Sequence, residues 1–189
     1  MVRSSADADW SHEIRYHVLL RQPEVRALIA HHAALAGKPM TVEKLIAGGV
    51  EMMDMGHGGD IAALAGILTW RLGRRMTARP KTRTEAIPFS PAHVMVALLC
   101  SLAQHGHRLL RTQQADDGCL FDAALRRSIF SGGGDLSVIV RRSDTGSAVE
   151  ARIRIRGRQI DWNNKGRRLL NQLFADLRSI PSTFVAPNR

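Results

Sequence analysis

Arginine occupies every second position from 152 to 158, in the segment ARIRIRGR. Side chains two residues apart on a β-strand point to the same face, about 6.6 Å apart, so this spacing predicts a row of cations. Guanidinium groups bind phosphate or carboxylate through N–H donors held in a planar fork. Gly157 interrupts the alternation before the last arginine, and two further arginines end the preceding predicted strand. The candidate partner- or anion-binding residues are Arg141, Arg142, Arg152, Arg154, Arg156 and Arg158.

Three interpretations of this arginine row remain open. It is the solvated outer face of a sheet, where charged side chains oppose edge pairing. The nearby Glu150 favours this interpretation, because a dedicated anion-binding face would avoid a carboxylate. It is a binding surface for an acidic protein. It is a nucleic-acid surface, since the spacing is close to that of phosphates along one strand. Single-strand readers usually stack bases on aromatic side chains, and near this sheet the sequence offers only Phe121 and Trp162.

A methionine cluster is the second candidate site. Met52, Met53 and Met55 stand at the end of a predicted helix and precede His57. Thioether and imidazole groups are ligands for soft metals, but methionines at a helix end more often pack against a neighbouring surface. We therefore interpret Met52, Met53 and Met55 as a candidate interface with an apolar partner, and not as a metal site.

Residue patterns that would indicate an enzyme are weak. His105 and His107 flank a glycine without a further ligand at metal-binding spacing. The glycine-rich segment at 131–135 precedes a strand, whereas phosphate-binding loops come between a strand and a helix. Asp161 is best explained as a helix cap. We predict no catalytic residue, no metal and no cofactor, while an enzyme with a small-ligand pocket between the two halves of the chain remains an alternative.

Composition describes a protein able to bury a core. The chain has 189 residues, of which 44% are hydrophobic and 23% charged, and a formal net charge of +10. This charge favours anionic partners, although a GC-rich bacterial genome would also enrich arginine. No apolar run approaches the roughly 18 residues of a membrane span. Two cysteines do not make a disulfide framework, and we expect a cytoplasmic protein.

The first half of the chain is predicted to be helical. Helical spacing of apolar residues, with proline or a capping residue at the start, indicates helices over residues 11–22, 23–37, 41–55 and 60–76. Residues 77–89 are polar and contain two prolines, so we interpret them as a basic linker between a helical region at 1–76 and a second domain at 90–181.

The second half is predicted to be a helix, four strands and a helix. Ser90-Pro91 begins a helix that ends near Gly106, and alternating segments at 107–114, 119–125, 135–142 and 147–156 indicate strands. Short turns make neighbouring strands antiparallel. A final helix is predicted to stop at Pro181, which leaves a loose tail at 182–189. The predicted fold class is α+β, with a helical N-terminal half and a four-stranded antiparallel meander whose flanking helices pack on one face.

The expected function follows from the arginine row and the methionine cluster. We predict a non-enzymatic adaptor or assembly module that binds an acidic or apolar protein surface. The alternatives are a nucleic-acid-binding protein that uses the arginine face and the small-ligand enzyme.

Overall fold

The fold comes from a computed structural model of the 189-residue chain. It describes residues 10–36, 43, 45, 53–54, 80–126, 133–155 and 164–185. Arg156, Arg158, Met52 and Met55 lie outside this part of the chain, as do the predicted helix at 60–76 and the aromatic residue Trp162.

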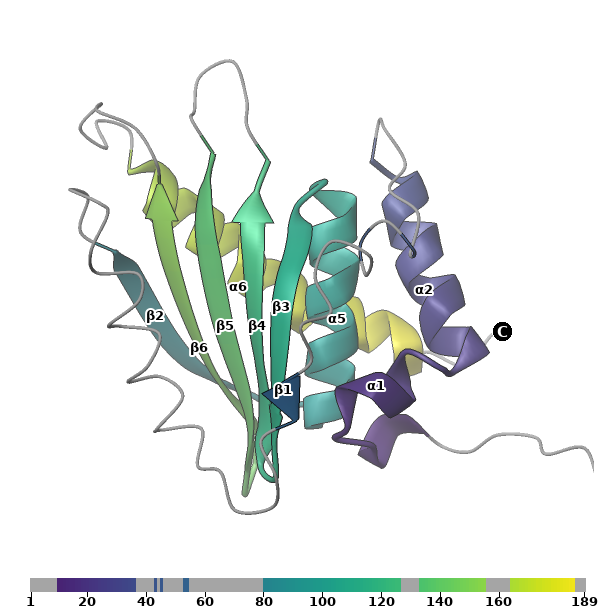
Figure 1. The fold of residues 1–189 in the computed structure, drawn as a ribbon. Coiled ribbons are helices and arrows are strands. Elements are labelled where there is room, and N and C mark those ends of the chain that lie inside the picture. The colour runs from purple at the N-terminus through teal and green to yellow at the C-terminus, as the bar shows by residue number, and fades with distance from the viewer. Residues whose placement is uncertain are drawn as a thin grey trace, which may run out of the picture.

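The fold class α+β is confirmed, with one more antiparallel strand than the sequence predicted. A single sheet has the order β1-β3-β4-β5-β6-β2, and Figure 1 shows its strands side by side in this order. The strands are β1 (Met53–Asp54), β2 (Lys81–Ile87), β3 (Arg108–Ala115), β4 (Gly118–Leu125), β5 (Gly134–Ser143) and β6 (Gly146–Ile155). Strands β3 to β6 form the predicted meander, β2 adds an antiparallel strand beside β6, and β1 pairs parallel with β3.

Strand β2 corrects the prediction of a linker over residues 77–89. It pairs with β6 from Lys81 opposite Ile153 to Ile87 opposite Ser147. Only Ile87 of this strand is buried, and polar residues occupy both faces of the strand before it. The sequence therefore lacks the alternation of apolar and polar residues that marks a strand. The β-branched Thr82 and Thr84 are the remaining sequence signal for extended structure.

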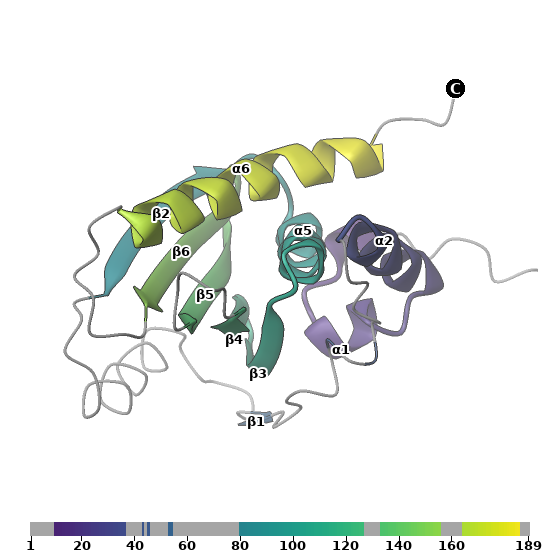
Figure 2. The ribbon, with the colours of Figure 1, turned by 90° about the horizontal axis from the view of Figure 1, so that it is seen from above.

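Two helices cover one face of the sheet, as predicted. They are α5 (Pro91–Gln104) and α6 (Lys165–Val185), and Figure 2 shows both on the same side of β3 to β6. The Ser90 side chain accepts a hydrogen bond from the backbone N–H of His93, which caps α5 as its sequence indicated. Helix α5 is buried along nearly its whole length, because the sheet, α6 and the N-terminal helices surround it.

Helix α6 continues through Pro181 and does not stop there as predicted. The Ser182 and Thr183 side chains donate to the carbonyls of Ser179 and Ile180, at 2.5 and 2.7 Å. These hydrogen bonds satisfy backbone carbonyls in the turn that contains the proline. The extra turn brings Phe184 against Trp10, with ring centroids 5.8 Å apart. Tertiary packing therefore outweighs the helix-breaking tendency of proline.

The N-terminal helices share one core with the sheet. They are η1 (Trp10–His12), α1 (Tyr16–Leu19) and α2 (Pro23–Ala34). Leu19, Val25 and Ile29 are buried in the same cluster as the helix-facing side chains of the sheet. The helix predicted over residues 41–55 does not reach its expected end, since Met53 and Asp54 form β1.

No helix within the described residues is long and apolar enough to cross a membrane.

Candidate functional site

The predicted geometry of the arginine strand is confirmed where the structure describes it. On β6, Val149, Ala151 and Ile153 are buried toward α5 and α6. Arg152 and Arg154 lie on the opposite face, which we call the far face. Both arginines are partly rather than fully exposed.

The far face carries carboxylates among its arginines. Glu150 lies on the same strand as Arg152, with 3.7 Å between its Oε1 and Nη2 of the arginine. The strand register places Asp135 of β5 opposite Arg154 of β6. This interleaving lowers the positive charge of the row, and exposed pairs of this kind contribute little stability.

A third pair, which the sequence did not predict, lies on the far face across strands β3 and β4. Arg111 of β3 donates from Nε and Nη2 to Oδ2 of Asp122 on β4, at 3.0 and 2.6 Å. Ser137 of β5 donates to the other carboxylate oxygen at 2.7 Å. The register of the β3–β4 hairpin places Arg111 opposite Asp122, and the register between β4 and β5 places Asp122 opposite Ser137. Only the pairing of three strands reveals this group.

The four described members of the predicted arginine set do not make one surface. Arg141 and Arg154 lie on the far face but at opposite ends of the strands, since Arg141 is level with Ala148 of β6. The Nε of Arg141 is buried without a hydrogen-bond partner among the described residues. Arg142 points to the helix-covered side, as the alternation of a strand requires. Arg156 and Arg158 lie outside the described residues.

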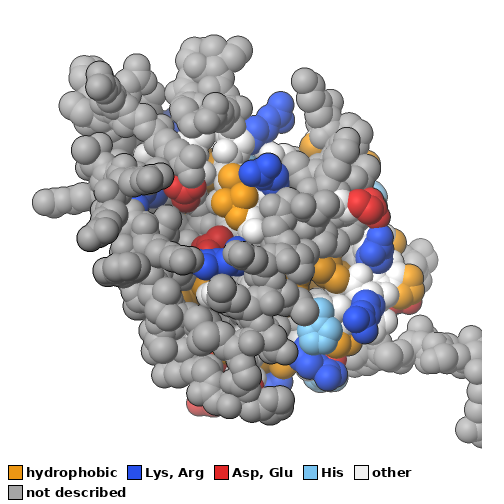
Figure 3. Space-filling model, viewed as in Figure 1, with side chains coloured by type: hydrophobic (Ala, Val, Ile, Leu, Met, Phe, Trp, Pro, Cys, Tyr) orange, Lys and Arg blue, Asp and Glu red, His pale blue; other side chains and the backbone are white. Residues whose placement is uncertain are grey.

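Positive charge gathers instead at one end of the strands. We call this surface the basic end, where β3 begins, β4 and β6 end and α6 begins (Figure 1). It consists of Arg108, Arg126, Arg154, Lys165, Arg167 and Arg168. Figure 3 shows Lys and Arg side chains at the upper end of the sheet in this view. Asp135 is the carboxylate that the described strands place there.

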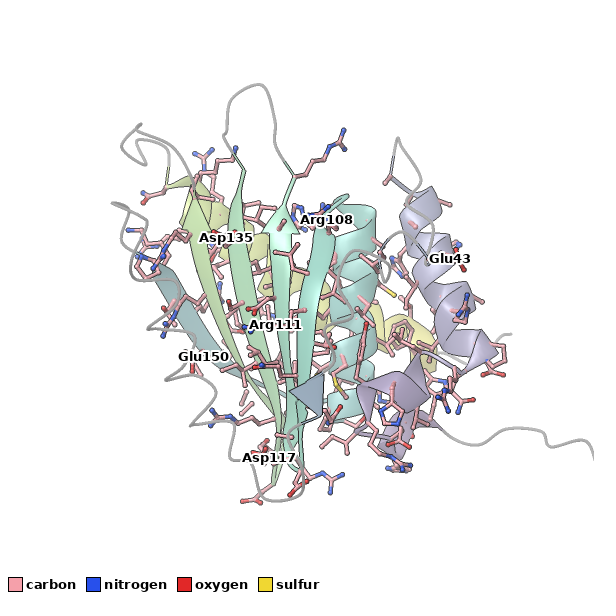
Figure 4. The ribbon with its side chains drawn as sticks, in the orientation of Figure 1. Glu43, Arg108, Arg111, Asp117, Asp135 and Glu150 are labelled. Carbon is pink, nitrogen blue, oxygen red and sulfur yellow. The ribbon has the colours of Figure 1, made fainter. Side chains whose placement is uncertain are left out.

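The opposite end of the strands is acidic at its turns. Asp116 and Asp117 join β3 to β4, and Asp144 lies in the turn between β5 and β6. Figure 4 shows Arg108 and Asp117 at opposite ends of the sheet. Arg141 and Arg142 lie beside these turns, so this end carries both signs of charge, whereas the basic end has an excess of positive charge. The spacing of the arginines alone did not indicate this difference.

A serine, a histidine and an aspartate meet between α5 and α6. Asp176 Oδ2 accepts from Ser101 Oγ at 2.6 Å and lies 2.9 Å from His105 Nε2. Gln172 donates to the other carboxylate oxygen at 2.8 Å. Burial acts to raise the pKa of Asp176, but the hydrogen bonds from His105, Ser101 and Gln172 outweigh it and the pKa is lowered.

This group is a structural tie and not a catalytic triad. In a triad the histidine stands between the serine and the carboxylate. Here Ser101 and His105 both contact the same carboxylate oxygen, and Ser101 is 3% exposed. The arrangement leaves no activated hydroxyl and instead fastens α6 to α5.

His107 lies close to the basic end but adds no charge at neutral pH. Burial, together with the nearby His105 and Arg126, lowers its pKa to about 4. Its Nδ1 lies 3.2 Å from the backbone N of Arg126, which donates to it. The positive charge of this surface therefore comes from arginine and lysine.

A small cavity of about 220 Å³ lies where the N-terminal segment meets the start of α5. Its lining residues are Ser11, His12, Glu13, Ile14, Ser90, Pro91 and Arg142. The Ser90 hydroxyl is 2.5 Å from the carbonyl oxygen of Ser11, to which it donates its proton. Glu13 is held by Arg15, whose side-chain hydrogen bonds lower the glutamate pKa to about 2. Two of the groups suited to nucleophilic or base chemistry are thus already engaged.

The methionine cluster falls largely outside the described residues. Only the backbone of Met53 is described, in β1. Among the described residues no three histidine, cysteine, aspartate or glutamate side chains are grouped to hold a metal ion. No protein-family model, curated protein or solved structure matches the chain, so its function is inferred from its own geometry.

Proposed function

We propose that the chain is a non-enzymatic binding module, with an adaptor or assembly role, that holds an acidic protein segment at its basic end. The observation that carries the proposal is the group of cations with no side-chain partner among the described residues. They are Arg108, Arg126, Arg167 and Arg168. They come from β3, the end of β4 and the first turn of α6, and all four are exposed.

The basic end supports this role better than the far face does. On the far face Arg111 and Arg152 already contact Asp122 and Glu150. A partner would have to displace these carboxylates before it gained an ion pair. At Arg108, Arg126, Arg167 and Arg168 an incoming carboxylate forms new pairs without that exchange, and the excess of positive charge at the basic end would steer it there.

An acidic partner is favoured over an apolar one by the described surface. Leu35 is the only large hydrophobic side chain that is exposed among the described residues, at 59%. A single exposed leucine does not form the contiguous apolar patch that marks a hydrophobic interface.

Nucleic acid remains the second candidate partner, because phosphates would satisfy the same guanidinium groups. The described aromatic rings are used in packing elsewhere. Tyr16 and Phe121 contact each other in the core, and Trp10 packs on His93 and Phe184. Base stacking would therefore need side chains other than these.

Charge reversal tests the proposal. The double variant Arg167→Glu/Arg168→Glu changes two exposed side chains of α6. Its matched control is Arg21→Glu/Arg142→Glu, which makes the same charge change at exposed positions away from the basic end. Binding is measured by fluorescence anisotropy with a peptide of alternating glutamate and threonine and, separately, with a single-stranded oligonucleotide of equal charge.

The expected result is salt-sensitive binding of the peptide that falls at least about tenfold in the α6 variant and much less in the control. Equal losses in both variants would mean that only net charge matters and would reject the basic end. If the oligonucleotide binds more tightly than the peptide, with a steep dependence on salt, the partner is nucleic acid and not an acidic protein.

A further inference from the structure

The hydrogen-bonding direction of β2 follows from the turn between β5 and β6. Ser143 lies opposite Gly146 across a turn of two residues. The pair that closes such a turn exchanges both main-chain hydrogen bonds, and successive residues then direct these groups alternately to the two neighbouring strands. Gly146 and every second residue after it therefore face β5. Arg142 fits this alternation, since its N–H donates toward β4, to Asp117 at 2.8 Å.

The residues of β6 that face β2 are thus Ser147, Val149, Ala151 and Ile153. Their partners in β2 are Ile87, Glu85, Arg83 and Lys81. The alternate residues of β2 direct their N–H and C=O groups away from β6. They are Thr82, Thr84 and Ala86, and all three are exposed.

This outer edge of β2 is unpaired within the described residues, since the sheet order ends at β2. At the other edge β1 pairs with β3. An unpaired strand edge is a template for another extended chain, and many peptide-binding domains use it in this way.

The side chains of β2 hold the strand in place from its helix-covered side. Arg83 forms an ion pair with Glu85 and donates to Asn171 of α6 at 2.6 Å. Its guanidinium carbon lies 4.9 Å from the centre of the Phe174 ring. Arg178 of α6 contacts Glu85 at 3.0 Å. These contacts order β2 before any partner arrives, so a partner need order only its own chain.

We propose that an extended acidic segment of a partner protein binds by adding a strand to the outer edge of β2. The proposal rests on the proposed function, since it names how the acidic partner is held. Main-chain hydrogen bonds to Thr82, Thr84 and Ala86 supply the docking. The members of the basic end that lie on α6, the helix packed against β2, determine which segment is accepted, namely Arg167 and Arg168.

Charge selects this occupant over a second copy of the chain. Lys81 begins β2 and is exposed, and Arg152 lies beside it on β6, opposite Thr82. Helix α6, which lies against β2, carries four basic side chains among its described residues and Asp176 as an acidic one. Two copies joined at β2 would bring these cations together, whereas like charges repel across adjacent strands. Glutamates of an added strand would instead face them.

The test separates strand addition from attraction of charge alone. The probe is the alternating glutamate–threonine peptide, compared with the same peptide N-methylated at every second amide, in both frames. N-methylation removes donors on one edge and leaves the charge unchanged. The protein variants are Thr84→Pro, which removes an outward N–H, and Thr84→Ala as its control, which keeps the N–H and removes the side chain.

Strand addition predicts that one methylation frame and Thr84→Pro each weaken binding at least about tenfold, while Thr84→Ala binds like the native chain. Hydrogen exchange of the amides in residues 82–86 should slow when the unmodified peptide binds. Circular dichroism and thermal melting verify that Thr84→Pro folds. If it does not, the methylation series decides alone.

Other outcomes overturn the proposal. If both methylated peptides bind like the unmodified one while Arg167→Glu/Arg168→Glu loses binding, the acidic partner is held by charge and β2 takes no strand. If the α6 variant also binds normally, the proposed function fails as well. If the native chain sediments as a dimer that Thr84→Pro dissociates, β2 is occupied by a second copy.

Discussion

The two edges of the sheet are finished in different ways. At the β3 edge the outward main-chain groups are covered by strand pairing with β1 and by the hydrogen bonds of one side chain. β1 pairs with Gln113 and Gln114, and the Gln114 amide bonds to the N-terminal segment, accepting from Tyr16 N at 2.8 Å and donating to the Ile14 carbonyl at 3.1 Å. At the outer edge of β2 only side chains are engaged by the part of the chain that the structure describes.

The difference shows that a strand can be held firmly while its main chain stays available. Arg83 and Glu85 fasten β2 to α6 from one face and use none of its outward N–H or C=O groups. Closure at β3 consumes such groups. The β3 edge therefore contributes to the stability of the fold, and the β2 edge is suited to binding.

The same substitution at the two edges gives the largest expected contrast. Thr112 of β3 directs its main chain away from β4, toward β1, and is 3% exposed, whereas Thr84 is exposed. We expect Thr112→Pro to lower the free energy of unfolding by about 3 kcal/mol or more, and Thr84→Pro by under about 1 kcal/mol. Urea unfolding of both variants measures the difference. Equal losses would mean that the β2 edge is closed like the β3 edge.

Removal of the Gln114 amide tests the closed edge directly. Its Nε2 also lies 2.9 Å from the carbonyls of Ala115 and Gly118. Gln114→Leu should lower the free energy of unfolding by about 2 to 3 kcal/mol, because main-chain groups of three segments lose a partner. Hydrogen exchange at residues 14–19 should accelerate before that of β4 and β5. Uniform acceleration would show that the amide does not act locally.

Substitution of Asp176 tests how firmly α6, the helix that packs against β2, is held to α5. Asp176→Asn should lower the free energy of unfolding by about 2 kcal/mol at neutral pH, since it places an amide against donors. The pKa of Asp176 is lowered from its usual value of 3.8. Its stabilisation is therefore present above that pH and is lost as the pH falls through the folded-state pKa.

Urea titrations of both proteins at several pH values measure this dependence. The difference between native chain and variant should shrink as the pH falls below about 4. A difference that stays constant into strong acid would assign the effect to packing and not to the charge.

The smallest effect is expected from the brace on β2 itself. Arg83→Met keeps the stem that covers Phe174 and removes the cation and its contact with Asn171. We expect a loss of about 0.5 to 1 kcal/mol, as for other partly exposed pairs. Thermal melting measures it, and Asn171→Ala is the matched control for the hydrogen bond alone.

The sequence predicts best where one residue pattern has one structural solution. The alternation on β6 and the short turn at Asp144 determine that hairpin, because a shift by one residue would expose every aliphatic side chain. The Ser90 cap likewise fixes the start of α5. Strand β2 has no such pattern. Arg83 and Glu85 lie on its helix-covered face, where aliphatic residues are expected, and they contact α6 through polar groups.

The candidate site was harder to predict than the fold. The arginine spacing gives the face of β6 but not the carboxylates that other strands bring to it, such as Asp122 and Asp135. The basic end is assembled from the ends of separate elements. Runs such as Arg167-Arg168 at the start of α6 carry a signal, but their position at the same end of the sheet as Arg108 depends on the strand order.

The contact of Phe184 with Trp10 has a consequence for how the chain is made. Synthesis on the ribosome delivers Trp10 first, and its ring partner on α6 follows only near the end of the described chain. His93, which packs on both rings, emerges in between. The ring cluster of Trp10, His93 and Phe184 can therefore be completed only after the last turn of α6 has been synthesised.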